Sequence, residues 1–119
     1  MRPQSLAEVA ELTAAGESFD FALRSFLDEF LSTGQPASLA TEPRRLDTRL
    51  DAYLAATAES LATERGLAVP AWAWAESRKL HRPWFALPWA GLRAVLLLES
   101  PAAFRSRNLF VSANALSRA

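Results

Sequence analysis

The feature that most constrains the fold is an apolar stripe near the amino terminus. Apolar residues recur there every three or four positions, which is the spacing of one face of an α-helix. Ser18 stands where a helix cap is expected, and Gly34 suits a left-handed stop. The sequence therefore predicts a helix between these two residues, with one face in a core. Its apolar positions are Phe19, Ala22, Leu23, Phe26, Leu27, Phe30 and Leu31.

Two further helices are predicted from their end signals. Ser5 and Glu8 have the spacing of a capping box for a short first helix. A longer helix begins between Pro43 and Asp47 and is closed by Gly66. Its predicted core face consists of Leu46, Leu50, Tyr53, Leu54, Thr57, Ala58 and Leu61, and its solvent face of Asp47, Arg49, Asp51, Glu59 and Glu64.

The carboxyl-terminal half has a different pattern. We expect a buried helix from Leu92 to Glu99, followed by a short helix that Ser100 caps and that a left-handed Asn108 ends. Residues 109–111 are expected to be extended, and Ser112 to cap a last short helix through Leu116. No stretch alternates for long enough to predict a sheet.

These signals together predict an all-α fold. We expect a single domain over residues 1–119, the size of one ordinary domain, with about five to seven helices. A connector is expected at residues 35–43. Prolines and tryptophans predict an irregular segment of short helical turns and ordered loops around residues 67–91.

Composition argues against most enzyme and metal chemistry. The chain has no cysteine and one histidine, His81, for which no acid or nucleophile partner is evident. Asp47 and Asp51 are one helical turn apart and are expected to be solvated. We therefore predict no catalytic residue, no cofactor and no metal. We also predict a cytoplasmic protein without a signal peptide or membrane contact, because the longest apolar run, Ala94–Leu98, is far shorter than a spanning helix of ~20 residues.

The net charge of zero conceals a gradient along the chain. Up to Thr33, six acids face two arginines, whereas from Arg78 onward seven basic residues face Glu99 alone. Such asymmetry has two readings: the two ends attract each other within the fold, or each end meets a different partner.

Protein binding is the function that the residue types favour. Trp and Arg concentrate binding energy at interfaces, and four tryptophans are too many for all of them to be fully buried in so small a core. The candidate partner-binding residues are Trp84, Trp89, Arg105, Arg107, Asn108 and Phe110.

Two stretches resemble a family. RLDAYLAATAESLATERGLAVPAWA (Arg49 to Ala73) and ESPAAFRSRNLFVSANALSRA (Glu99 to Ala119) are similar to small bacterial helical proteins that look like antitoxin-type partners of nucleotidyltransferase-type toxins. Some members carry an added helix-turn-helix. The resemblance implies a non-catalytic partner that binds a toxin enzyme and blocks its site. A second copy of this chain is another expected partner.

The alternative function is a small DNA- or RNA-binding regulator. Its support is the basic carboxyl-terminal portion, where aromatic residues lie near arginines. The helix–glycine–helix arrangement of residues 5–31 superficially matches a helix-turn-helix. Its second helix is acidic, however, whereas a reading helix needs basic and amide groups.

Overall fold

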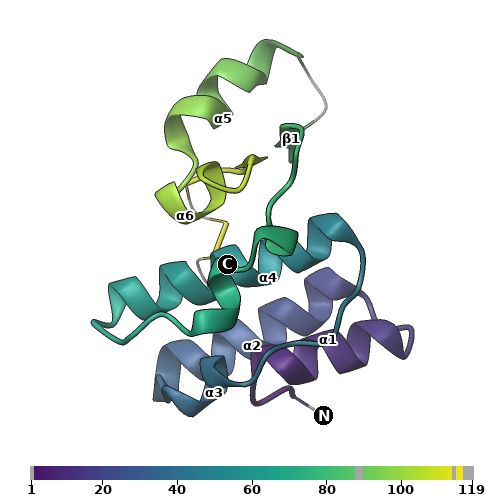
Figure 1. Ribbon diagram of the computed structural model, residues 1–119, viewed down its shortest axis with the longest axis vertical. Coiled ribbons are helices and arrows are strands. Elements are labelled where there is room, and N and C mark those ends of the chain that lie inside the picture. The colour runs from purple at the N-terminus through teal and green to yellow at the C-terminus, as the bar shows by residue number, and fades with distance from the viewer. Residues whose placement is uncertain (1, 88–89, 114, 117–119) are drawn as a thin grey trace.

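The computed structural model describes residues 2–87, 90–113 and 115–116 and shows an all-α fold with one very small sheet (Figure 1). The predicted fold class is confirmed, with six α-helices in the described part of the chain. The elements are α1 (Leu6–Ala14), α2 (Phe19–Thr33), α3 (Ala37–Ala40), α4 (Thr48–Glu64), the 3-10 helices η1 (Ala71–Trp74) and η2 (Glu76–Arg78), β1 (Trp84–Phe85), the 3-10 helix η3 (Ala90–Leu92), α5 (Arg93–Glu99), α6 (Ala102–Arg105) and β2 (Leu109–Phe110).

The first two helices begin and end where the sequence predicts. At the start of α1, Ser5 Oγ accepts the N–H of Glu8 at 3.1 Å. The Glu8 carboxylate accepts the N–H of Gln4 at 3.0 Å, one residue earlier than in a standard capping box. Ser18 caps α2, and Gly34 ends it in the left-handed conformation with φ of 60°. These local hydrogen bonds fix where each helix can start.

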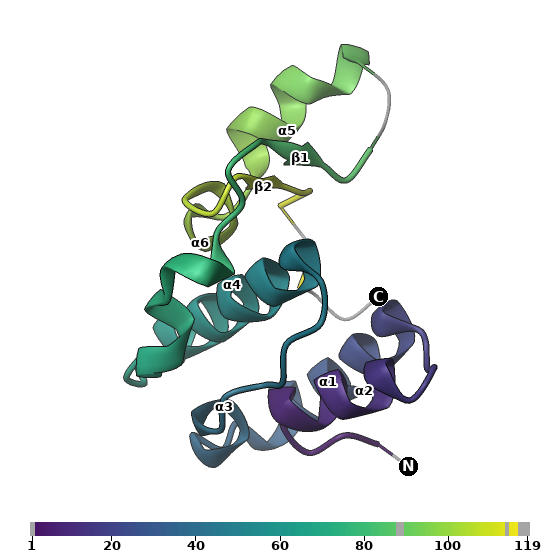
Figure 2. The same cartoon turned by 45° about the vertical axis from the view of Figure 1, so that its right-hand side comes forward.

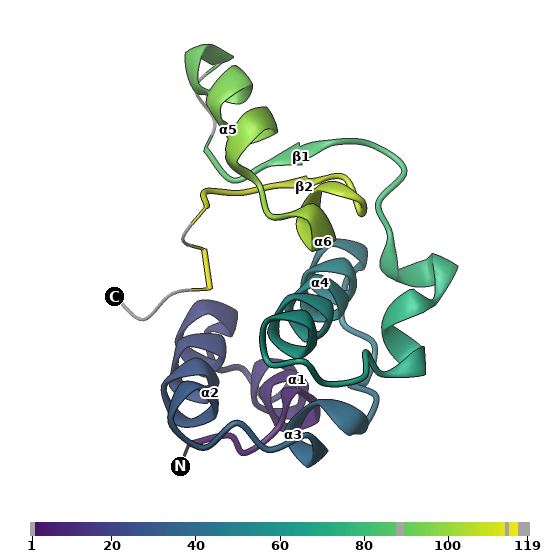
Figure 3. The ribbon, with the colours of Figure 1, turned by 90° about the vertical axis from the view of Figure 1, so that its left-hand side faces the viewer.

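α4 is the central helix and is buried on both sides. One side packs on α1 and α2, and the other packs on α6 (Figure 3). The prediction of a solvent face that includes Asp51 was wrong, because this residue is only 6% exposed. The connector and η2 cover Asp51, which accepts hydrogen bonds from the Leu46 N–H and, at its carbonyl, from Arg78. A separate face of α4, which packs on α6, carries alanines in place of bulky side chains. Ala52 and Ala56 let Ala103 and Phe104 of α6 approach closely.

The predicted connector and irregular segment are more ordered than loops. Residues 35–43 contain α3, one helical turn that the sequence did not reveal. The Trp72 indole N–H donates to the carbonyl of Leu39 at 3.0 Å and so ties η1 to α3. Within the described part of the segment 67–91, short 3-10 turns and one two-residue strand alternate with loops, as expected.

The small sheet was not predicted. β1 pairs in parallel with β2, with Trp84 opposite Leu109 and Phe85 opposite Phe110. Residues 109–110 are extended, as expected. Two-residue strands are too short to produce an alternating pattern, so the pairing has no sequence signal.

Three predictions near the carboxyl end had different outcomes. Asn108 is left-handed with φ of 63°, as expected. Ser100 does not cap α6: its Oγ accepts the Val111 N–H at 2.8 Å and lies 2.6 Å from the Leu96 carbonyl. After Ser112, the described residues 113 and 115–116 form a turn and no helix.

The elements form a body and an arm. α1 to α4 make up the body, and residues 80–87 and 90–111, here called the arm, project from one end of it (Figures 1 and 2). The radius of gyration of 13.5 Å is that expected for one domain of this length. None of the helices in the described residues is both long and apolar enough to span a bilayer.

Candidate protein-interaction surface

The arm is assembled around the two-strand sheet. The N–H groups of Trp84 and Ala86 donate to the carbonyls of Asn108 and Phe110, both at 2.9 Å. The rings of Phe85 and Phe110 stack with centroids 5.1 Å apart. The sheet is therefore held together by backbone hydrogen bonds and by the stacked rings of Phe85 and Phe110.

Two features attach α5 to this sheet: the buried side chain of Leu96 and the hydrogen bonds of Ser100. Leu96 is its only buried residue. The Ser100 hydroxyl bridges the end of α5 and Val111, which follows β2, through buried hydrogen bonds. A buried helix was predicted from Leu92 to Glu99: the helix is confirmed, but its burial was wrong, because no element in the described part of the chain covers the outer side of α5 (Figure 2).

The outer side of α5 therefore exposes large apolar side chains. Leu98 is 81% exposed, Leu97 45% and Val95 43%. A helix that is apolar on all sides is usually buried, and contiguous exposed apolar surface marks an interaction site. We call this surface the arm patch. It consists of Leu87, Leu92, Val95, Leu97 and Leu98.

Arg107 fixes the root of the arm to the body. Its guanidinium is 1% exposed and pairs with the Glu59 carboxylate of α4 at 2.6 Å. It also donates to the carbonyls of Ala103 at 2.7 Å and Ala73 at 2.9 Å, and lies 5.6 Å from the Trp74 ring centroid. The Arg107 charge is therefore paired within the fold and is not available to a partner.

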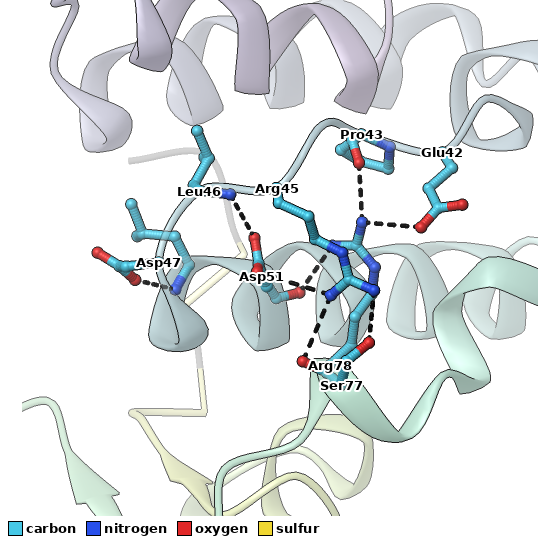
Figure 4. A network of polar contacts seen from close by, with 9 residues as sticks. Glu42, Pro43, Arg45, Leu46, Asp47, Asp51, Ser77 and Arg78 are labelled. Carbon is cyan, nitrogen blue, oxygen red and sulfur yellow. Dashed lines mark hydrogen bonds and ion pairs between the residues drawn. The ribbon is translucent and has the colours of Figure 1, made fainter.

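Arg78 makes a second buried junction (Figure 4). It donates to the carbonyls of Pro43 at 2.8 Å and Asp51 at 3.2 Å, and to the exposed Glu42 carboxylate at 3.3 Å. The Trp72 ring lies 4.9 Å from its guanidinium carbon. η2 is thereby held against α4 and the connector.

The two aspartates of α4 serve the backbone. Asp47 accepts the Leu50 N–H at 2.7 Å and caps the helix. Asp51 accepts the Leu46 N–H at 2.7 Å and lies 3.7 Å from Arg45 (Figure 4). The two carboxylates are engaged separately and do not form a paired acid site.

The structure brings the predicted partner-binding residues together only in part. Arg105 is exposed on α6. Trp84 and Asn108 are half-buried; Arg49 covers the Trp84 ring at 4.9 Å, and the Asn108 amide donates to the Leu80 carbonyl at 2.7 Å. The remaining three do not form a surface: Arg107 and Phe110 are buried within the fold, and Trp89 lies outside the described residues.

The expectation that some tryptophan reaches the surface is confirmed. Trp74 is 54% exposed, and Trp72 and Trp84 are half-buried. The arm patch itself was not predicted from the sequence. Its signal was the run Ala94–Leu98, which is apolar at five successive positions and thus apolar around a whole helix. Such a helix is covered either by its own chain or by a partner.

The structure also resolves how the charge gradient is arranged. None of the ion pairs between described residues joins residues 2–33 to residues 79–116. α5 and the small sheet lie at the far end of the 38 Å long molecule from α1 and α3 (Figure 1), whereas the root of the arm is nearer, because Tyr53 contacts both Phe19 of α2 and Phe104 of α6. Of the two readings, attraction between the ends within the fold gains no support from these ion pairs between described residues.

Other chemistry-bearing groups are isolated. His81 is exposed and makes no hydrogen bond or ion pair within the described residues. No group of three or more potential metal ligands occurs in that part of the chain. A depression of about 180 Å³ between α4 and α6 is lined by Glu59, already paired with Arg107, by Glu64 and by four small residues. Ligand sites are commonly larger, about 300–1,000 Å³.

Among the titratable groups of the described residues, Tyr53 alone has a shifted pKa. Burial raises the pKa of its phenol above the usual 10.0, the Asp20 charge adds to this effect, and Arg49 opposes it. Its ring packs edge-on against Phe19 and Phe104. Tyr53 therefore has a packing role between α2 and α6.

Fold and surface together define a small helical protein that presents an uncovered apolar arm. Comparison with protein-family models, curated proteins and solved structures gives no match to this chain. The antitoxin resemblance of Arg49 to Ala73 and Glu99 to Ala119 therefore remains a hypothesis.

Proposed function

We propose that this chain is a non-catalytic protein-binding module that works in the cytoplasm through the arm patch. The observation that carries the proposal is the exposure of Leu98, Leu97 and Val95 on a helix with one buried residue. Burying apolar surface contributes about 25 cal/mol per Å², so this patch favours a partner that covers it. The isolation of His81 supports a role without catalysis.

We propose a nucleotidyltransferase-type toxin as the partner, on the basis of the antitoxin resemblance. The arm carries exposed arginines, Arg82, Arg93 and Arg105, against the single acid Glu99. It therefore suits an apolar groove with an acidic rim. Occupation of such a groove near an active site blocks access to the enzyme.

Co-expression tests this proposal. Under it, the gene beside that of this chain encodes an enzyme that arrests growth when expressed alone. Co-expression of the chain restores growth, and the two proteins co-purify. Leu98→Glu places a charge in the centre of the contact and abolishes both effects. Phe21→Glu, an equally severe change at an exposed aromatic on α2, leaves both intact. Full rescue by the Leu98→Glu chain contradicts the proposal.

The three exposed arginines of the arm favour one second candidate, a DNA- or RNA-binding regulator. Phosphate contacts make such binding fall steeply with added salt. Binding to a random duplex that is lost at moderate salt and survives Leu98→Glu supports this candidate. Enzyme binding that is insensitive to salt and lost with Leu98→Glu supports the first.

A further inference from the structure

The arm patch and the acidic end of the molecule are complementary in two respects. The arm combines exposed leucines with the arginines Arg82 and Arg93. At the start of α2, Glu17 and Asp20 flank Phe21, which is 62% exposed. We call these three residues the α2 patch. Each surface thus offers apolar area together with a charge opposite to that of the other.

The two surfaces do not meet within one chain. No ion pair or ring contact between described residues joins the arm patch, Arg82 or Arg93 to the α2 patch. Each surface therefore keeps its charge and its exposed apolar side chains. A second copy supplies what each surface lacks.

We propose that in the free chain the arm patch of one copy binds the α2 patch of another. This inference rests on the proposed function, because it names what covers the same surface before an enzyme partner arrives. Arg82 and Arg93 approach Glu17 and Asp20, while the leucines of α5 cover Phe21. Self-association and enzyme binding then compete for the arm patch.

The charges select this contact over the symmetric alternative. Pairing two arms would bring Arg82, Arg93 and Arg105 against the same three residues of the other copy, with only Glu99 to offset them. Like charges across an interface are unfavourable. The contact is therefore between two different surfaces, and each copy has one of each kind.

A contact between two different surfaces can be tested by mixing two variants, each of which lacks one of the surfaces. Leu98→Glu destroys the arm patch and keeps the α2 patch, whereas Phe21→Glu does the reverse. In sedimentation velocity over a concentration series, we expect the unchanged chain to self-associate and each variant alone to be monomeric, with affinity at least about thirtyfold weaker. Mixing the two variants restores association as one-to-one heterodimers, because an intact arm then meets an intact α2 patch.

The possible outcomes separate this inference from the proposed function. If the unchanged chain is monomeric up to about 1 mM, the inference is wrong, while enzyme binding lost with Leu98→Glu still supports the proposed function. Self-association that survives Phe21→Glu shows pairing through the arms and also overturns the inference. Circular dichroism confirms that both variants, changed at exposed positions, retain the helical fold.

A charge swap provides an independent check. Arg93→Glu alone places like charges across the contact, and we expect about tenfold weaker association or worse. Combining it with Asp20→Arg in the same chain restores opposite charges and recovers the association. Failure of the double variant to recover contradicts the inference.

Discussion

At the residue scale, the two buried arginines matter most for reading this sequence. Arg78 and Arg107 were counted among the basic residues of the carboxyl-terminal portion, and Arg107 was a candidate for partner binding. Both instead hold segments against α4 through backbone carbonyls and one carboxylate each. Sequence alone does not separate a buried arginine from an exposed one, because its partners are distant in the chain.

Arg107 and Arg105 form a matched pair for mutation. Arg107→Ala leaves the Glu59 carboxylate without its ion-pair partner and the Ala73 carbonyl without its Arg107 donor, and the Ala103 carbonyl keeps only its hydrogen bond from Ser106 among side-chain donors. We expect the free energy of unfolding to fall by about 3–5 kcal/mol, since removal of one member of a buried ion pair costs that much. Arg105→Ala, at an exposed position, is expected to change it by less than about 0.5 kcal/mol. Urea unfolding measures both, and equal effects contradict the assignment.

Tyr53 gives a prediction on pH. Because its pKa is raised in the folded chain, the unfolded chain loses the phenol proton first, at about pH 10. Stability is thus unaffected below that pH and falls as pH rises from there through the folded pKa. Tyr53→Phe removes this part of the decline. Urea unfolding between about pH 9 and 11 tests it, and the same slope in both proteins contradicts the assignment.

At the element scale, α4 shows how tightly alanine faces are packed. Ala56 is fully buried beneath α6, so Ala56→Leu forces additional methyl groups into the contact. We expect destabilisation of about 1–3 kcal/mol. Ala14→Leu, at the exposed end of α1, serves as the control and is expected to be nearly neutral. The midpoint of thermal unfolding compares them, and tolerance of Ala56→Leu would show a loose α4–α6 contact.

Much of the helical framework could be predicted because its signals are local. Caps at Ser5, Ser18 and Asp47 and left-handed stops at Gly34 and Asn108 depend on neighbouring residues alone. All of these except Asp47, which was expected only as a solvated residue of the helix, were predicted correctly. A serine hydroxyl can also make hydrogen bonds other than a capping one. The Ser100 hydroxyl joins α5 to Val111 and does not cap α6.

The arm patch could not be predicted, because it exists only where the rest of the described chain leaves the apolar side chains of α5 exposed. The apolar run at residues 94–98 predicts burial whether the cover comes from the same chain or from another. Likewise, the alanines of α4 are compatible with an exposed face and with a second core. The tertiary structure decides both cases: α6 packs on the alanine face of α4, whereas only Leu96 of α5 is buried.

At the scale of the whole molecule, charge and apolar exposure coincide at both ends. The sequence showed the charge gradient, and none of the ion pairs between described residues joins residues 2–33 to residues 79–116. Exposed charges such as Glu17 and Arg82 therefore remain for association. The same reasoning explains why a net charge of zero says little about partners here.

The body and the arm are expected to differ in stability. α4 buries ten residues, whereas α5 buries only Leu96. Amides of α5 should therefore exchange hydrogen through local opening, at a free energy well below that of global unfolding, while amides of α4 exchange only when the whole chain unfolds. Hydrogen-exchange mass spectrometry on the dilute chain measures the two helices together. Equal protection of α5 and α4 would mean that the arm is as firmly held as the body, and that its leucines are less accessible to a partner than their exposure indicates.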